Sequence, residues 1–280
     1  MSSSEVGLFY DNQSNGPGKV RDNLIKGLKN IGITVIHNQP SYLTGWLHGV
    51  PDMNTPNSWL LGPNLFTLPS DINTEFWSQR RTVVVPCNWV KTIYDKFYKL
   101  LNSPTTVNVW AVGIDTEKFE PQKGQRRKCL VYHKRGNENN LKLILETLTS
   151  LKIEHTVLKY GEYTEERLMS ACGESLFAIL NTSTESQGIA YQEILSMGIP
   201  CYVIDKEVWD DRPEVSCPAS SAPYFDDRCG IKHNNLSRLS EFLDRLSTFK
   251  PRDYILDNLT LEKCASEYIR LLEICHATKS

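Results

Sequence analysis

Two glutamates, Glu185 and Glu193, are the side chains whose type and spacing best suit ligand chemistry in this sequence. They lie in the stretch 181–200 (NTSTESQGIAYQEILSMGIP), where small polar residues follow an apolar run and precede a helix-like pattern. A carboxylate accepts hydrogen bonds from hydroxyl groups well, so Glu185 at the strand end suits a sugar. Glu193 is placed one to two turns into the helix, where we expect it to reach ribose hydroxyls.

The residues between the two glutamates predict an anion site. The expected helix begins at Ile189, so the backbone N–H groups of Gln187–Ala190 would point out of its start toward phosphate oxygens. Gly188 has no side chain and lets a ligand approach the backbone closely. This pattern therefore predicts that a phosphate-bearing, hydroxyl-rich ligand binds here.

A structural role for the two glutamates is the alternative interpretation. Glu193 would then be a solvated helix residue, and Glu185 an acid in the first helical turn that the helix dipole favours. For a bare pair of glutamates that interpretation is preferable. Gly198 and Pro200 end the helix and begin the next strand, however, and this strand–loop–helix–strand context favours binding.

The rest of the chain alternates short β-rich runs with helical periodicity, which is typical of an α/β protein with largely parallel sheets. Residues 38–73 are rich in Pro, Gly, Asn and Trp, and we expect long loops there with one strand-like piece at 58–61. The other expected strands are 6–10, 33–37, 82–86, 106–110, 129–133, 155–159, 176–181 and 200–204. The expected helices are 20–30, 88–101, 141–150, 164–171, 189–197 and 259–274.

The strand–helix rhythm restarts after the polar segment 120–127 (EPQKGQRR), which suggests a linker between two domains. We expect a Rossmann-like domain over 1–122, a second over 123–258, and a final helix within 259–280. Ligands bind at the carboxyl ends of parallel strands, so the predicted site is a cleft across which the two sheets face each other.

Composition narrows the class of ligand. The 280 residues include 31 basic and 33 acidic side chains, a net charge of −2, so nucleic acid and anionic membranes are disfavoured as partners. We expect no signal peptide and no membrane span, because no apolar run approaches about 18 residues. The eight cysteines are scattered without a C-x-x-C pair, which indicates buried free thiols in a cytoplasmic protein.

The stretch around the two glutamates resembles the Glu-x7-Glu signature of nucleotide-sugar glycosyltransferases with the twin-Rossmann (GT-B) fold, especially family four. Residues 112–121 (VGIDTEKFEP) are similar to a segment that ends the N-terminal domain in that family. Residues 84–90 (VVPCNWV) resemble a strand–helix entry that precedes it. The resemblance implies an enzyme that moves a sugar from a nucleotide-diphosphate donor to a hydroxyl of a glycan acceptor. It also implies that the final helix, here within 259–280, crosses back to the N-terminal domain.

The resemblance also assigns roles. Glu193 binds the ribose, Glu185 contacts the donor sugar, and the loop residues Ser186, Gln187, Gly188 and Ile189 hold sugar and diphosphate. Arg135 stands where the family has an arginine that neutralises the diphosphate. The companion lysine is missing, since Asn139 and Asn140 occupy its place, and Lys134 is its substitute here. Alternatively, Lys134 and Arg135 are two solvated basic residues in a turn.

The segment 12–18 (NQSNGPG) fits the glycine-rich loop that approaches the donor, through Gly16 and Gly18. It matches neither a P-loop nor a dinucleotide fingerprint, because the required Ser/Thr and third glycine are absent. No DxD-like motif occurs in a suitable loop. We therefore expect a metal-independent enzyme without a cofactor, in which backbone amides and cations stabilise the leaving diphosphate.

The stereochemistry stays open at this point. The Glu-x7-Glu pattern implies retention, but residues 180–204 also resemble exostosin-like enzymes, which invert. An inverting enzyme needs a general base, for which Asp11, His48 and Asp52 are the candidates.

The compact chain is similar to small transferases of large algal viruses. This likeness makes a UDP-sugar, with UDP-xylose as best guess, the expected donor ahead of GDP-sugars, and the host cytoplasm the expected location. Two rival functions are a nucleotide-sugar-binding protein without turnover and a nucleotide-sugar epimerase of the same architecture.

Overall fold

The computed structural model describes residues 4–11, 16–47, 51–63, 68–212 and 215–277. The chain forms two compact units. Unit 1 comprises residues 1–113 and 259–280, and unit 2 comprises residues 114–258. The border between the units lies between Gly113 and Ile114, earlier in the sequence than the expected border at 122. Residues 114–121 pack within unit 2, where Arg252 donates to the carbonyls of Thr116 at 3.1 Å and Phe119 at 3.2 Å.

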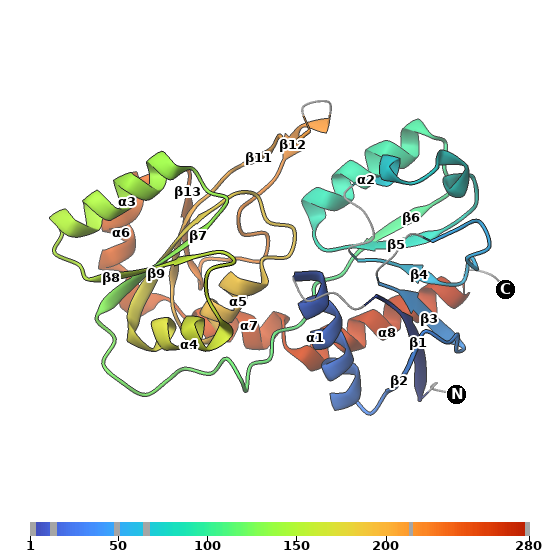
Figure 1. Ribbon diagram of the computed structural model, residues 1–280, viewed down its shortest axis with the longest axis horizontal. Helices are drawn as coiled ribbons and strands as arrows, with labels where there is room; N and C mark the ends of the chain where they lie inside the picture. The colour runs from blue at the N-terminus through green and yellow to red at the C-terminus, as the bar shows by residue number, and fades with distance from the viewer. Residues whose placement is uncertain (1–3, 12–15, 48–50, 64–67, 213–214, 278–280) are drawn as a thin grey trace. The chain divides into compact units, whose positions relative to one another are not determined.

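Unit 1 is built on a six-stranded parallel sheet in the order β2-β1-β3-β4-β5-β6 (Figure 1). Its strands are β1 (Glu5–Phe9), β2 (Thr34–His37), β3 (Leu43–Trp46), β4 (Leu60–Leu61), β5 (Thr82–Val85) and β6 (Thr106–Val109). Its helices are α1 (Gly16–Asn30), α2 (Asn88–Leu100), α8 (Leu261–Ala277) and the short 3-10 helices η1 (Pro69–Asp71) and η2 (Thr74–Ser78).

Helix α8 completes the core of unit 1 although it comes from the other end of the chain. Its buried residues recur every three or four positions, so one apolar face turns inward against α1, β3 and β4. Trp110 donates its indole N–H to the carbonyl of Cys264 at 2.7 Å. The Trp110 ring also meets Tyr268 edge-on at a centroid distance of 4.9 Å.

Unit 2 is built on a five-stranded parallel sheet in the order β13-β10-β9-β7-β8. Its strands are β7 (Lys128–Lys134), β8 (His155–Lys159), β9 (Ser175–Thr182), β10 (Cys201–Ile204) and β13 (Gly230–His233), and a separate hairpin pairs β11 (Val208–Trp209) with β12 (Cys217–Pro218). Its helices are α3 (Glu138–Ser150), α4 (Glu165–Glu174), α5 (Ile189–Ser196), α6 (Leu239–Asp244), α7 (Pro251–Asn258), η4 (Leu236–Arg238) and η5 (Leu246–Thr248).

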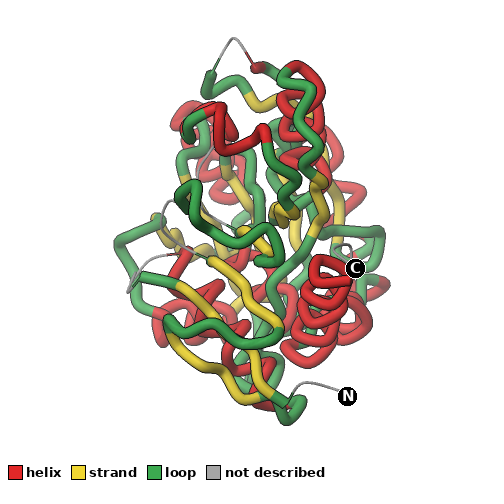
Figure 2. The backbone as a smooth tube through the Cα atoms, turned by 90° about the vertical axis from the view of Figure 1, so that its right-hand side faces the viewer, coloured by secondary structure: helices red, strands yellow, loops and turns green. Residues whose placement is uncertain are grey.

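Helices cover both faces of the unit 2 sheet (Figure 1). Figure 2 shows the helix that leads to the C-terminus, α8 of unit 1. Buried side chains of α3 and α6, such as Ile144 and Phe242, share one apolar cluster with Val131 of β7 and Ile179 of β9. Helices α4 and α5 lie on the other side of the sheet. Side chains Asn137 and Thr164 cap α3 and α4 by accepting backbone N–H groups, which fixes where each helix begins.

The structure confirms the predicted α/β class with two Rossmann-like, parallel-sheet domains. It also confirms that all eight cysteines are buried free thiols. The expectation of loops over 38–73 was wrong for β3, a four-residue strand that pairs with both β1 and β4. No helix in the described parts of the chain is long and apolar enough to cross a bilayer.

Candidate functional site

The neighbouring strands β7 and β9 define the switch point of the unit 2 sheet. From β7 the chain continues through α3 to β8 at one edge, and from β9 it continues through α5 toward β10 and the opposite edge. In open parallel sheets, ligands bind at the carboxyl ends of such a pair of strands. The predicted residues Lys134 and Glu185 come from these two strand ends, at the end of β7 and three residues after β9.

Lys134 and Glu185 form a close ion pair. The Lys134 Nζ lies 2.7 Å from Oε1 and 2.9 Å from Oε2 of Glu185, whose side chain is only 11% exposed. Burial raises the pKa of the Glu185 carboxyl, and the nearby positive charges of Lys134 and Arg135 oppose that rise. The Lys134 ammonium also lies 4.7 Å from the ring centre of Tyr160, a cation–π contact.

Arg135 lies in the tight turn between β7 and α3. Its backbone has a φ of 53°, a left-handed conformation that is uncommon for a residue with a side chain. It forms an isolated bridge to Thr182 at the end of β9, and its own side chain is exposed. The turn thus presents a guanidinium to solvent close enough to act on the Glu185 carboxyl.

Helix α5 begins at Ile189, as predicted, and its capping residue Gly188 has a left-handed φ of 72°. Ile189 and Ser186 are half-buried, so the described chain does not fully cover this helix start. The first N–H groups of a helix have no partner within it and carry partial positive charge. Gln187 is buried, and its carbonyl accepts the Gln192 side-chain amide at 2.6 Å, which stiffens the turn.

Glu193 lies further along α5 and is only 1% exposed. Burial raises the pKa of the Cys172 thiol on α4, and the negative charge of Glu193 adds to that rise. The structure therefore does not place Glu193 on the open surface beside Ile189. Its assignment to the ribose stays a prediction.

A loop that sequence reasoning missed supports the Glu185 backbone. The Glu185 N–H donates to the carbonyl of Ser220 at 3.0 Å. Asp205, just after β10, accepts the Ser220 hydroxyl at 3.0 Å and the Ser221 N–H at 2.6 Å. The Ser221 hydroxyl in turn donates to the carbonyl of Thr182 at 3.1 Å. The loop is thereby joined to the carboxyl ends of two strands.

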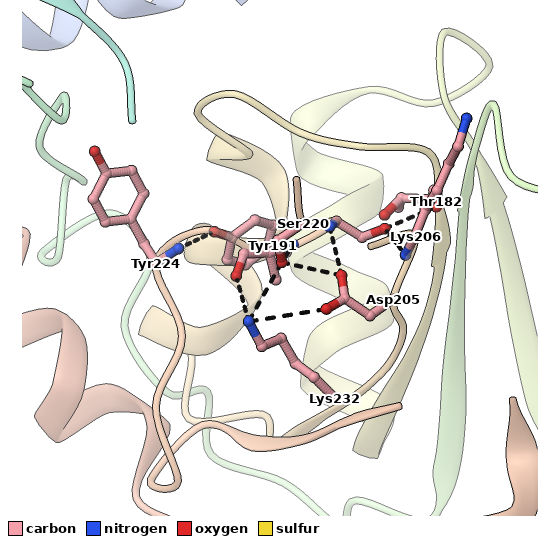
Figure 3. A network of polar contacts seen from close by, with 9 residues as sticks. Thr182, Tyr191, Asp205, Lys206, Ser220, Tyr224 and Lys232 are labelled. Atoms are coloured by element: carbon pink, nitrogen blue, oxygen red, sulfur yellow. Dashed lines mark hydrogen bonds and ion pairs between the residues drawn. The ribbon is translucent and has the colours of Figure 1, made fainter. Parts of the chain in front are cut away.

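Figure 3 shows the outer part of this loop. The Lys232 ammonium donates to the Ser220 hydroxyl at 3.3 Å and lies 4.0 Å from the Asp205 carboxylate. The Tyr224 N–H donates to the hydroxyl of Tyr191 in the first turn of α5 at 3.0 Å. The Tyr224 ring points away from these contacts (Figure 3).

The remaining predicted site residues belong to unit 1. Asp11 is exposed, and its carbonyl accepts Arg21 at 3.2 Å. Asp52 is exposed and accepts the N–H of Asn54 at 2.9 Å, within its own turn. His48 lies outside the described residues.

The two predicted loop glycines are helical. The structure begins α1 at Gly16, so the expectation of a glycine-rich loop through Gly16 and Gly18 was wrong at these positions. Gly18 is buried within the helix. A contact of either glycine with the donor stays a prediction.

Unit 1 has its own switch point between β1 and β3, and aromatic rings mark it. Phe9 and Trp46 end these strands as register partners, with ring centres 5.4 Å apart and planes 9° from parallel. The ring of Trp59 lies 4.5 Å from that of Phe9. All three are half-buried. We call these three residues the aromatic face.

The aromatic face points away from α8. A side chain added at Gly45 would meet Tyr268 of α8, so Gly45 faces that helix. Successive strand residues alternate between the two faces of a sheet, which places Trp46 and its partner Phe9 on the opposite side.

Across the described ranges, no three His, Cys, Asp or Glu side chains gather as a metal ion would need.

Comparison with known proteins identifies the fold. No family profile and no curated protein sequence matches the chain. Among solved structures, a sucrose-phosphate synthase (tll1590) from Thermosynechococcus elongatus has a TM-score of 0.60 at 9% identity, over 98% of this chain and 100% of that one. The catalytic domain of starch synthase IV from Arabidopsis thaliana, bound to ADP and acarbose, has a TM-score of 0.57 at 8% identity, over 98% and 99%.

A third structure, the lipopolysaccharide outer core galactosyltransferase WaaB in its apo form, has a TM-score of 0.54 at 10% identity, over 99% of this chain and 100% of that one. The structural neighbours are GT-B glycosyltransferases, and the chain has their fold. At these identities the likeness shows the fold alone, and function depends on the site. Membership of family four and exostosin-like character stay predictions.

Proposed function

We propose that the protein is a glycosyltransferase that moves a sugar from a nucleotide-diphosphate donor to a hydroxyl of a glycan. The observation that carries the proposal is the meeting of Lys134, Glu185 and the half-open start of α5 at the switch point of unit 2. Cations and helix amides suit a pyrophosphate, and a buried carboxylate beside them suits a sugar.

In this proposal the pyrophosphate binds at the start of α5. The N–H groups from Gln187 to Ala190, with Lys134 and Arg135, stabilise the negative charge that develops on the leaving diphosphate. Glu193 then binds the ribose, which requires its buried carboxyl to become accessible to the ligand. The starch synthase neighbour was solved with ADP, a nucleoside diphosphate, which supports this class of ligand.

Glu185 is the proposed partner of the donor sugar. Its carboxylate would accept sugar hydroxyls and stabilise the positive charge that develops on the sugar ring as the bond to the diphosphate breaks. The Lys134 ammonium contacts both carboxyl oxygens of Glu185 in the structure. We infer that it shifts toward the phosphate when the donor binds, so that it contacts both the phosphate and the carboxylate. This arrangement needs no metal ion. We propose retention of configuration, with Asp11, His48 and Asp52 as candidate bases if the enzyme inverts.

The donor is proposed to be a UDP-sugar, with UDP-xylose as the first candidate. The test is incubation of the purified protein with UDP-xylose, UDP-glucose, UDP-galactose and GDP-mannose, with and without glycosides, followed by nucleotide chromatography. Glycoside-dependent release of UDP supports transfer. Interconversion of UDP-sugars would identify an epimerase, and binding without turnover would identify a nucleotide-sugar-binding protein. Either of those results would overturn the proposal.

The acceptor is proposed to bind at the aromatic face of unit 1. Trp46 and Trp59 are half-buried at a switch point, and flat aromatic rings pack against the C–H faces of pyranose rings. We therefore propose that a pyranose ring of the glycan lies on these indoles.

Replacing Trp59 by alanine should raise the KM for a methyl glycoside acceptor about tenfold, the equivalent of ~1.4 kcal/mol of lost contact. The KM for the donor should stay unchanged, because the donor residues belong to unit 2. Initial rates with methyl β-xyloside and methyl β-glucoside measure both constants. Tyr42→Ala, which removes an aromatic ring that is 68% exposed in the same unit, is the control. Equal acceptor KM values in the two variants would contradict the assignment.

A further inference from the structure

His133 is a buried imidazole at the edge of the candidate site that the proposed chemistry does not use. It precedes Lys134 at the end of β7 and is 7% exposed. Its Nδ1 lies 3.0 Å from the side-chain Nδ2 of Asn181 on β9. Its Nε2 lies 2.9 Å from Oε1 of Glu138, the first residue of α3. Both ring nitrogens therefore have a polar partner.

These partners define the protonation state of the ring. The Asn181 Nδ2 also lies 3.0 Å from the carbonyl oxygen of Asn137, which can only accept, so this atom is the donating amide nitrogen. The His133 Nδ1 must accept from it and carries no proton. The remaining proton is on Nε2, which donates to the Glu138 carboxylate. All three contacts are satisfied by the neutral imidazole.

The same contacts hold both ends of the turn 134–136. Asn181 binds His133 before the turn and Asn137, the capping residue of α3, after it. Gly136 passes so close to the Asn181 backbone that any side chain there would overlap it. The left-handed backbone of Arg135 is thus maintained by fixed neighbours on both sides.

We propose that neutral His133 is a positioning residue that holds the Lys134–Arg135 turn in the geometry that binds the donor pyrophosphate, and that its protonation releases this turn. The inference rests on the proposed function of the site and adds a residue and a pH dependence to it. A protonated ring carries N–H groups on both nitrogens. Its Nδ1–H would then face the Asn181 amide, donor against donor, and that contact would break.

Charged residues surround His133 on the neighbouring elements. Glu138 contacts the ring from α3, Lys134 is the next residue on β7, and Lys159 is the register partner of His133 on β8. Arg135 adds a further positive charge one residue beyond Lys134, and β9 contributes the uncharged Asn181. Histidine changes charge between about pH 5 and 8, so kcat/KM for the donor should fall on the acid side of that range.

Three substitutions separate this mechanism from a merely structural role. Asn181→Asp provides an acceptor for Nδ1–H, favours the protonated ring, and should move the acid limb of the pH profile up by about one unit. Glu138→Gln keeps an acceptor for Nε2–H, removes the favourable charge, and should move the limb down. His133→Gln should move the limb to lower pH, where protonation of Glu185 becomes limiting. His155→Gln, on β8 with its ring near the Ile153 carbonyl, is the control and should leave the limb unchanged.

The experiment measures kcat/KM for the UDP-sugar from pH 5 to 8.5, UDP affinity by calorimetry over the same range, and imidazole nitrogen shifts by ¹⁵N NMR. We expect a neutral Nε2–H tautomer for His133 at pH 8. We also expect the acid limb to shift in opposite directions in Asn181→Asp and Glu138→Gln. An Nδ1–H tautomer, or limbs that move in the same direction, would overturn the proposal. The NMR titration needs no turnover, so it still tests the His133 contacts if the transferase assay and UDP binding both fail.

Discussion

Glu185→Gln is expected to lower kcat/KM for transfer by about 10²- to 10³-fold, the loss typical when a preorganised electrostatic group is removed from an active site. The glutamine keeps the shape of the side chain but lacks the negative charge that stabilises the developing positive charge on the sugar. Lys134 would also lose the ion pair that directs its Nζ to this point. The variant is assayed with the best donor and acceptor of the panel.

The same substitution predicts the sign of a stability change with pH. Burial raises the pKa of Glu185 in the folded protein. The folded state therefore holds the proton more tightly than the unfolded chain, whose glutamates titrate at about 4.3. As the pH rises above that value, the wild type loses stability relative to Glu185→Gln. Thermal melts at pH 4 and pH 7 measure this difference, which should favour the variant more at pH 7.

Glu174→Gln is the matched control for activity. Glu174 also pairs with a lysine, since Lys128 Nζ lies 2.7 Å from its carboxylate, but this pair is exposed and lies at the amino end of β7. Its removal should leave kcat/KM within twofold of the wild type, because the pair lies at the end of β7 opposite to Lys134. The loss of an exposed ion pair costs at most about 1 kcal/mol of stability. Similar activity losses in the two variants would show that Glu185 has no special role in transfer.

Gly188→Ala is expected to weaken UDP binding by about 10- to 100-fold, equivalent to ~1.4–2.8 kcal/mol. An added Cβ would overlap ring carbon Cε1 of Tyr191. The ring has little freedom to move, because its hydroxyl accepts the Tyr224 N–H at 3.0 Å. The start of α5 would shift instead, and the amides that are proposed to hold the pyrophosphate would shift with it. Calorimetric titration with UDP measures the effect.

Gly32→Ala separates this effect from simple backbone strain. Gly32 has a φ of 80°, close to the 72° of Gly188, but an added Cβ there would meet nothing within 4 Å. Both alanines occupy a left-handed conformation at a cost of about 1–2 kcal/mol of stability. Only the Gly188 variant should lose UDP affinity. A Gly188→Ala protein that melts as Gly32→Ala does and binds UDP normally would contradict the site at α5.

Local signals predicted much of the fold. Buried strands such as β9 and β10 are continuous apolar runs, and α5 is bounded by Gly188 and Gly198, so sequence alone placed these elements nearly correctly. Strand β3 was missed because Thr44 and Gly45 interrupt its apolar residues. Strand β13 was missed because its side chains, including Lys232, do not form an apolar run.

Part of the candidate site was also predicted from a local sequence pattern. Glu185, Gly188 and the start of α5 belong to one continuous motif, which a local pattern can reveal. The support from Ser220 and Asp205 depends on contacts between residues that are distant in sequence and carry no common pattern. His133 and Asn181 offered a weak signal, since each is a polar residue that ends a buried apolar strand.

A crystal structure with UDP bound is the most direct test of the central claim that the start of α5 holds a pyrophosphate. We predict the β-phosphate within hydrogen-bonding distance of the Ile189 and Ala190 N–H groups, with Lys134 or Arg135 in contact and the ribose hydroxyls reaching Glu193. A pyrophosphate bound elsewhere on the protein, with this helix start unchanged, would contradict the claim.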